Sequence, residues 1–308
     1  AIDFLPYGVG RYAREIAARL PALRPAWRWH ILRHTSAPAA ELARPCIVAD
    51  AMPKDDYLAE QARWQELRAR FSPDLIHSLW FHTAEAADCL RVLTVQDTIL
   101  LKHYREYQNT HFLGRKHYYY RSIEAADGII APSLNTCREL SALMRFPPNA
   151  VRHIPLAAAP DFAGATHASR RTVRRKYNLP PKFFFASAHY GHSYKNFDLI
   201  LAAFNILARY RRDVPPLVLT GKMPPATLHS GMRYLGFVPD RDLAAVIAES
   251  LALIYPPVTK DSDCRFWKPW PAARRSCVRA PHPSRKWRAK LRFILPLPIL
   301  MSWQTPCE

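Results

Sequence analysis

The stretch LALIYPP, residues 251–257, separates two parts of the chain that have different sequence patterns. A short apolar run that ends in prolines is typical of a strand buried on both faces of a parallel sheet. Upstream of this run, apolar runs and amphipathic segments alternate regularly. Downstream of Val258 the alternation stops, so we expect an ordinary α/β fold before this point and a different kind of sequence after it.

Residues 1–160 predict the first of two Rossmann-like domains, because runs of strand length alternate there with amphipathic segments of helix length. The predicted strands are residues 1–5, 27–32, 75–78, 91–95, 128–131 and 151–155. The predicted helices are residues 11–20, 57–71, 115–126 and 135–145. This order predicts a mostly parallel sheet with helices on both faces.

Residues 161–176 change to small and basic side chains, which indicates a linker. The alternation resumes over residues 177–258, which we interpret as part of a second Rossmann-like domain. The strands expected there are residues 182–188, 216–220, 232–237 and 251–255, and the expected helices are residues 197–210 and 240–250. The pattern ends near the middle of this second sheet, so we expect a truncated second domain.

The net charge of +19 is spread over the whole chain: residues 259–308 carry 11 Lys and Arg against 3 Asp and Glu. A basic body suits phosphate-bearing ligands or an anionic membrane surface, and a solvated basic face explains it equally well. Nucleic-acid binding is a third hypothesis, but the α/β enzyme pattern explains residues 1–257 better.

Six cysteines without a CxxC pair argue against a disulfide scaffold and a zinc site, and we expect Cys46, Cys89 and Cys137 to be reduced thiols. A cytoplasmic location, at most peripheral to a membrane, follows from this pattern. No apolar run reaches the length of a membrane span. The chain starts without methionine or a signal-peptide pattern, and the start is interpreted as clipped.

Glycines and polar residues mark two candidate ligand contacts. Gly8 and Gly10 precede a helical pattern, where backbone N–H groups can approach a phosphate, although a plain tight turn has the same signature. Gln96 and Asp97 follow a predicted strand, at the edge where open α/β sheets bind ligands. Ser133 also follows a strand, and its expected role is to cap a helix.

Nine stretches of the chain, each weak alone, follow one another in a recognisable order. They are GVGRYAREI, PDLIHS, VLTVQDTILL, ADGIIAPSLNTCREL, VRHIPLA, YKNFDLILAAFNIL, PLVLTGK, LGFVPDRDLAAVIAES and LALIYPP. Together they resemble the family 4 glycosyltransferases, which are retaining enzymes of the GT-B fold. The resemblance covers residues 1–258 and is strongest to bacterial mannosyl- and rhamnosyltransferase-like members of surface-polysaccharide pathways.

The resemblance implies two facing Rossmann-like domains. The second would bind a nucleotide-diphosphate sugar, with GDP-mannose as the family-level expectation, and the first a saccharide or lipid-linked acceptor. No metal or other cofactor is implied. Gly8 and Gly10 match the family's glycine loop beside the donor phosphates. Lys195 matches the cation that neutralises the departing diphosphate, and His192 lies in the same loop, where many members carry an Arg.

The same resemblance places Gln96 and Asp97 in the catalytic cleft. Many members have a histidine where this chain has Gln96, while Asp97 is retained. Glutamine can orient a group by hydrogen bonding but cannot exchange a proton near neutral pH.

After a strand such as LALIYPP, family members continue with a stretch like YEGFGLPxLEAMAxG, whose two glutamates hold the nucleotide ribose and help to position the donor sugar. This chain continues with TKDSDCRFWKPWPAARRSC instead. If one nucleotide is missing next to the Val258 codon, four neighbouring pairs force one original residue each. The pairs are Asp263 with Cys264 (Leu), Phe266 with Trp267 (Leu), Trp267 with Lys268 (Glu) and Trp270 with Pro271 (Ala).

The forced residues coincide with the family pattern, and the other positions can be chosen to give YEGFGLPVLEAMACGTPVV. Residues 259–308 also lack glycine and hold four of the eight tryptophans. We therefore interpret residues 259–308 as a frameshifted tail, in which Asp261 and Asp263 mimic a metal-binding DxD motif by accident. The leading hypothesis is a glycosyltransferase that is inactive as written, and the alternative is a remnant that binds an acceptor or a membrane without catalysis.

Overall fold

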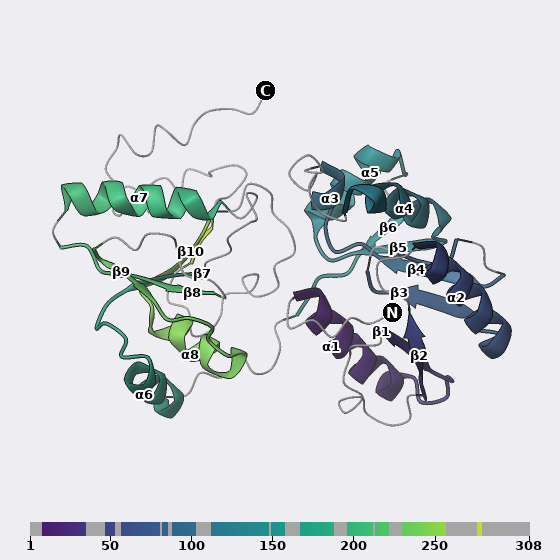
Figure 1. Cartoon of the computed structure of the whole chain (residues 1–308), viewed down its shortest axis with the longest axis horizontal. Coiled ribbons are helices and arrows are strands. Elements are labelled where there is room, and N and C mark those ends of the chain that lie inside the picture. The colour runs from purple at the N-terminus through teal and green to yellow at the C-terminus, as the bar shows by residue number, and fades with distance from the viewer. Residues whose placement is uncertain are drawn as a thin grey trace. The chain divides into compact units, whose positions relative to one another are not determined.

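The computed structural model describes residues 8–34, 47–52, 57–80, 82–85, 88–102, 112–147, 149–157, 167–187, 196–211, 213–221, 230–256 and 276–278. These residues form two compact units. The first contains the described residues up to Ala157, and the second contains those from His167 onward. Each unit is an α/β structure with parallel strands (Figure 1).

The first unit contains six strands and five helices among its described residues. In chain order they are α1 (Gly8–Leu23), β1 (His30–His34), β2 (Ile47–Met52), α2 (Tyr57–Phe71), β3 (Leu75–Ser78), β4 (Leu90–Thr94), α3 (Ile99–Lys102), α4 (Phe112–Ala125), β5 (Gly128–Ala131), α5 (Leu134–Met144) and β6 (Val151–His153). Strands β3, β4, β5 and β6 form a parallel sheet in that order, and β1 pairs with β2 in parallel. Strand β2 and helix α3 were not expected from the sequence, and the expected strand at residues 1–5 lies outside the described residues.

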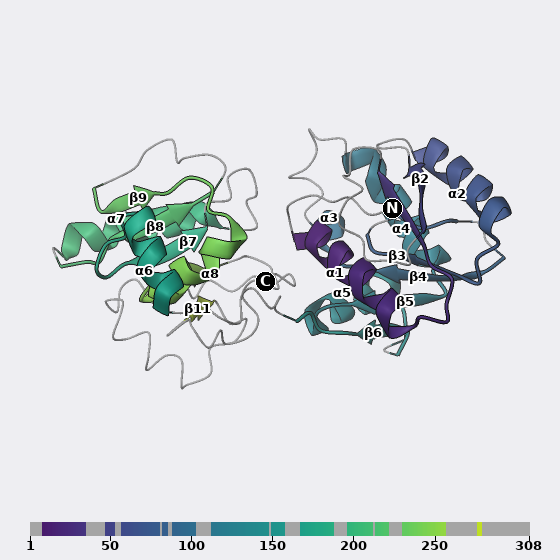
Figure 2. The ribbon, with the colours of Figure 1, turned by 90° about the horizontal axis from the view of Figure 1, so that it is seen from below.

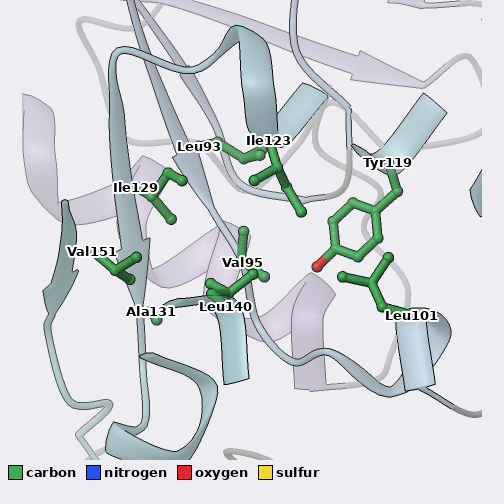
Figure 3. Close-up of a cluster of buried hydrophobic side chains, with 9 residues drawn as sticks. All are labelled: Leu93, Val95, Leu101, Tyr119, Ile123, Ile129, Ala131, Leu140 and Val151. Carbon is green, nitrogen blue, oxygen red and sulfur yellow. The ribbon is translucent and has the colours of Figure 1, made fainter. Parts of the chain in front are cut away.

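The core of the first unit forms where α3, α4 and α5 pack on β4 and β5 (Figure 3). Leu93 on β4 and Ile123 on α4 are both completely buried. Tyr119 is buried with them, and its hydroxyl donates to the backbone carbonyl of Asp97 at 2.8 Å. The apolar ring is therefore covered while its polar end is satisfied, as a buried tyrosine requires.

The second unit contains three helices and five strands among its described residues. They are α6 (His167–Lys176), β7 (Phe184–Ser187), α7 (Phe197–Tyr210), β8 (Leu217–Thr220), β9 (Met232–Tyr234), α8 (Asp240–Glu249), β10 (Ala252–Tyr255) and β11 (Ser276–Val278). The strands pair in parallel in the order β11-β10-β7-β8-β9. Helix α7 lies on one face of this sheet, and α8 lies on the other with α6 beyond it (Figures 1 and 2).

The LALIYPP stretch supplies β10, which is buried as the apolar run predicts. Ala252, Leu253 and Tyr255 are at most 6% exposed. Strand β10 pairs with β7 through Ala252 and Leu253. It therefore lies inside the sheet, where both faces are covered and a continuous apolar run is stable.

Two further segments differ from the sequence-based expectation. The predicted linker, residues 161–176, ends in helix α6, whose Arg174 forms an ion pair of 2.6 Å with Glu249 of α8. The polar composition hid this helix, because only Val173 of its described side chains is buried. The tail interpreted as frameshifted was expected to show no alternation of strands and helices, yet its described residues form β11, which pairs with β10.

Candidate functional site

The carboxyl edge of the first sheet gathers polar side chains that are withdrawn from solvent. Ser78 ends β3, Thr94 ends β4, and Gln96 lies two residues after the end of β4. These three side chains are 2%, 1% and 5% exposed. Ligands of open α/β sheets bind beyond the carboxyl ends of the strands, so this edge is the candidate site of the first unit.

Thr94 is the hydrogen-bonding centre of this edge. Its hydroxyl lies 2.9 Å from Nε2 of His77 on β3 and 3.4 Å from the hydroxyl of Tyr12 on α1. Tyr12 belongs to the first turns of α1, which also contain Gly8 and Gly10. The Thr94 contact therefore fixes the glycine-containing start of α1 near the ends of β3 and β4.

Burial holds His77 in its neutral form. It lowers the pKa of this imidazole to about 4, well below its ordinary value. Burial also raises the pKa of the Tyr12 phenol. Both groups are uncharged at neutral pH, so they act here as fixed hydrogen-bonding groups rather than as charges.

Gln96 and Asp97 are adjacent at this edge but differ in their surroundings. Gln96 is buried, whereas Asp97 is partly exposed and its Oδ1 accepts a hydrogen bond of 3.0 Å from the backbone N–H of Ile99. Asp97 thus helps to start α3. Its carboxylate is held in one orientation by this bond, which is compatible with a further contact to a ligand.

Ser133 caps helix α5, as the sequence predicts. Its hydroxyl accepts a hydrogen bond of 3.0 Å from the backbone N–H of Thr136, and its own backbone is extended. This is the geometry of a helix N-cap, and the cap accounts for a polar residue directly after β5.

In the second unit, the strand order identifies a crevice without reference to any side chain. The chain passes from β7 outward to β8 and β9, and then returns to place β10 on the other side of β7. Such a reversal is a topological switch point, where the connections leaving the two strands diverge and leave room for a ligand. The segments that begin after Ser187 of β7 and Tyr255 of β10 leave the sheet at this switch point, which is the candidate site of this unit.

Helix α7 begins directly after the first of these segments. Its N-cap residue Asn196 has φ 54° and makes no side-chain capping bond. The first N–H groups of the helix and the positive end of its dipole favour an anion at this terminus. Lys195 and His192 precede the helix and lie outside the described residues.

Cys89 and Cys137 are free thiols, and burial raises the pKa of each; Cys46 lies outside the described residues. Where the chain is described, no cluster of three or more His, Cys, Asp or Glu could hold a metal ion. Asp261 and Asp263 lie outside that part. No described helix is long and apolar enough to cross a membrane.

The sequence analysis did not identify His77, Thr94 and Tyr12 as site residues. All three come from segments predicted correctly as strands or helix, but their contact depends on which residues of β3, β4 and α1 face one another. A polar side chain at the end of a buried strand was the one available signal, and it applies to Thr94.

Comparisons with known proteins agree with this description. Residues 6–162, about half of the chain, match the model of Glycosyltransferase Family 4. O-antigen chain mannosyltransferase B of Escherichia coli is 26% identical over 148 residues, which are 44% of this chain and 39% of that protein. The serotype-specific mannosyltransferase WbdA of Escherichia coli is 22% identical over 250 residues, which are 76% of this chain and 30% of that protein. The chain thus covers less than half of the length of these relatives.

Solved structures show the same architecture at low identity. Sucrose-phosphate synthase of Thermosynechococcus elongatus matches with a TM-score of 0.59 and 16% identity, over 83% of this chain and 71% of that one. Anabaena Alr3699/HepE, solved with UDP and glucose, matches with a TM-score of 0.56 and 13% identity, over 83% of this chain and 73% of that one. The fold is the GT-B fold of glycosyltransferases, and the chain belongs to Glycosyltransferase Family 4.

Proposed function

We propose that this chain is the larger part of an enzyme that transfers a sugar from a nucleotide-diphosphate sugar to a saccharide or lipid-linked acceptor. The observation that carries this proposal is the switch point between β7 and β10. One of its two bordering segments contains His192 and Lys195. The other begins at Pro256, next to the point where the sequence departs from the family pattern.

The donor would bind with its diphosphate toward the start of α7. When the bond between the sugar's anomeric carbon and the diphosphate oxygen breaks, the leaving group gains negative charge. Lys195, with His192 beside it, would stabilise that charge together with the helix N-terminus. We also propose phosphate contact for the backbone N–H groups at Gly8 and Gly10, because these glycines match the glycine loop of the family.

The acceptor would bind at the carboxyl edge of the first unit. There Gln96 and Asp97 would orient the acceptor hydroxyl, whose oxygen forms the new bond to the anomeric carbon of the sugar while its proton passes to the departing diphosphate. The buried hydrogen bonds around Thr94 support this proposal, because they hold the polar edge in a fixed arrangement before any ligand binds.

GDP-mannose is our first candidate for the donor, because the two Escherichia coli relatives are named as mannosyltransferases. UDP-glucose is the second, because a structural neighbour was solved with UDP and glucose. No metal or cofactor is part of the proposed reaction. The unpaired cysteines and the basic surface favour a cytoplasmic enzyme in a polysaccharide pathway.

We further propose that the chain as written has little or no activity, because residues 259–308 are a frameshifted tail. The two glutamates that the family uses for the donor ribose and sugar are then missing. Strand β11 does not replace them, since Ser276–Val278 contains no glutamate.

The test compares the present chain with one expressed after a single base is inserted next to the Val258 codon. The restored chain should release nucleotide diphosphate from GDP-mannose or UDP-glucose in the presence of an acceptor saccharide, and the present chain should not. In the restored chain, Lys195→Ala should lower kcat at least 100-fold, whereas the exposed Lys182→Ala, a matched control, should not. Turnover by the present chain would contradict the proposed inactivity.

A non-catalytic remnant is the second candidate function. It is favoured by the first unit, because the described hydrogen bonds of its polar edge join Tyr12, His77 and Thr94, which all precede Ala157. Acceptor binding by the present chain without any binding of nucleotide sugar would support this alternative over the first proposal.

A further inference from the structure

The turn that follows α1 presents large apolar side chains to solvent beside arginines. This basic-aromatic turn comprises residues 23–29. Leu23 is 66% exposed and Trp27 is 56% exposed. The Trp27 ring stacks on the ring of Trp29, with 5.6 Å between the centroids and 25° between the planes.

Backbone hydrogen bonds hold this turn in one conformation. The carbonyl of Arg24 accepts two bonds of 3.1 Å, one from the backbone N–H of Trp27 and one from Nε1 of Trp29. The N–H of Arg24 in turn donates to the carbonyl of Leu20 in the last turn of α1. A rigid aromatic side chain loses little conformational entropy when it binds, so the turn is preorganised for contact.

The charge around the exposed tryptophan is positive. Arg24 and Arg28 are exposed and donate to the backbone carbonyls of Leu23 and Phe71, at 3.2 and 3.3 Å. Neither is paired with a carboxylate among the described residues. The exposed Arg70 lies close by, with its guanidinium 5.0 Å from the centre of the Phe71 ring.

Three carboxylates lie at the same end of the unit, and two of them are paired: Asp88 with Arg68 and Asp127 with Arg91. Asp74 is exposed in the connection between α2 and β3, three residues after Phe71. Counted with these pairs, five arginines oppose three aspartates among the described residues, which leaves this end cationic. A partner of this surface therefore has to suit both its exposed apolar residues and its positive charge.

We propose that the basic-aromatic turn docks the protein on an anionic lipid bilayer. Tryptophan is favoured at the boundary between headgroups and hydrocarbon, an adjacent leucine adds apolar area there, and each arginine gains energy from anionic headgroups. A neutral saccharide would use the tryptophan but not the three arginines. A nucleic acid would use the tryptophan and the arginines but leave Leu23 exposed.

The proposed bilayer contact lies at the end of the unit opposite to the candidate site. Tyr12 near the start of α1 reaches the carboxyl end of β4, whereas the turn follows the last residue of α1. This inference goes beyond the proposed function and does not rest on it, because no residue of the turn takes part in donor or acceptor binding.

The test measures co-sedimentation of the full chain with vesicles of phosphatidylcholine, alone or mixed with phosphatidylglycerol. The wild-type chain should bind the mixed vesicles and bind the neutral ones much more weakly. Trp27→Ser should weaken binding about tenfold, from the loss of one large apolar side chain. Arg24→Gln and Arg28→Gln should each weaken it about fivefold and reduce its sensitivity to salt.

Two controls separate the turn from the rest of the basic chain. Tyr210→Ser removes an aromatic side chain that is 77% exposed on α7, and Arg171→Gln removes an exposed arginine on α6. Both should bind vesicles like the wild type. Trp27→Phe, which keeps most of the apolar area and the fold, should retain most of the binding.

Three results would overturn the proposal. The first is equal vesicle binding by wild type and Trp27→Ser. The second is an equal loss of binding in the two controls. The third is a Trp27-dependent affinity for single-stranded DNA or for a soluble mannan without any vesicle binding, which would reassign the turn to a nucleic acid or to a saccharide.

Discussion

The two units have the same kind of parallel sheet, but their candidate sites depend on different parts of the chain. In the first unit, residues at the ends of β3 and β4 form the polar edge. The same two strands contribute buried side chains to the hydrophobic core. In the second unit, the candidate site lies at the carboxyl ends of β7 and β10, and residues 188–195, which follow β7, lie outside the described part of the chain. The fold is therefore recognisable from its buried strands, whereas the donor contacts that we propose to be missing belong to the sequence after Val258.

The largest difference in stability between the two units should appear when a core residue of one unit is replaced by alanine. Leu93→Ala leaves a cavity under α4 and should destabilise the first unit by about 3 kcal/mol. Leu219→Ala should have an effect of similar size in the second unit. Hydrogen-exchange mass spectrometry in denaturant reports both units separately, and each substitution should weaken protection in its own unit alone. Equal loss of protection in both units after Leu93→Ala would mean that they unfold together.

The second largest effect should be a pH dependence of the stability of the first unit. The folded-state pKa of His77 is about 4, below its ordinary value of 6.5. The unfolded chain therefore binds more protons between these values. The free energy of unfolding of the first unit is therefore unaffected by His77 above pH 6.5. It declines by up to about 3 kcal/mol as the pH falls from 6.5 to 4.

His77→Gln should remove this pH dependence from the first unit, because glutamine does not titrate and its amide can still bond Thr94. Denaturant midpoints from pH 7 to pH 4 measure the effect. The exposed His117→Gln is the matched control and should keep the wild-type slope. An unchanged slope in His77→Gln would show that other groups cause the acid sensitivity.

A smaller effect should show that α6 belongs to the second unit. The ion pair between Arg174 and Glu249 is partly buried, and Arg174 also donates to the carbonyl of Pro180 at 2.9 Å. Arg174→Ala should therefore destabilise the second unit by about 1–2 kcal/mol. The exposed pair of Arg211 and Asp213 provides the control, and Arg211→Ala should leave the denaturant midpoint unchanged. An unaffected second unit after Arg174→Ala would restore α6 to the role of a linker.

The smallest expected effect concerns the N-cap of α5. Ser133→Ala should cost about 1 kcal/mol of the first unit's stability, because the N–H of Thr136 loses its acceptor. Ser133→Thr should keep most of that stability. A larger loss of acceptor binding than of stability in Ser133→Ala would instead indicate a ligand contact.

Apolar patterning made much of the fold predictable. The bounds of α2, β3, β5 and α7 agree with those expected, because each has a clear period and a polar or proline-containing boundary. Helix α6 was missed because its surface is mostly arginine. Strands β2 and β11 were missed because neither is a long apolar run.

The candidate site was less predictable than the fold. The positions of Gln96 and Asp97 after a strand followed from the sequence, as did the capping role of Ser133. The hydrogen bonds that join Tyr12, His77 and Thr94 did not, since they depend on strand register and on how α1 packs. The roles of Gly8, Gly10, Lys195 and His192 rest on resemblance and stay predictions.

The central claim is that a glycosyltransferase is interrupted next to Val258 by the loss of one base, and the codons of the gene test it most directly. The account predicts the codon ACG for Thr259, because this codon gives the first glutamate of the family pattern in the shifted frame. It also predicts the codon TCG for Ser262, because this codon gives a glycine of that pattern. With these codons, the shifted frame reads through the family segment without a stop. Any other codon for Thr259 removes that glutamate from the shifted frame and would contradict the account.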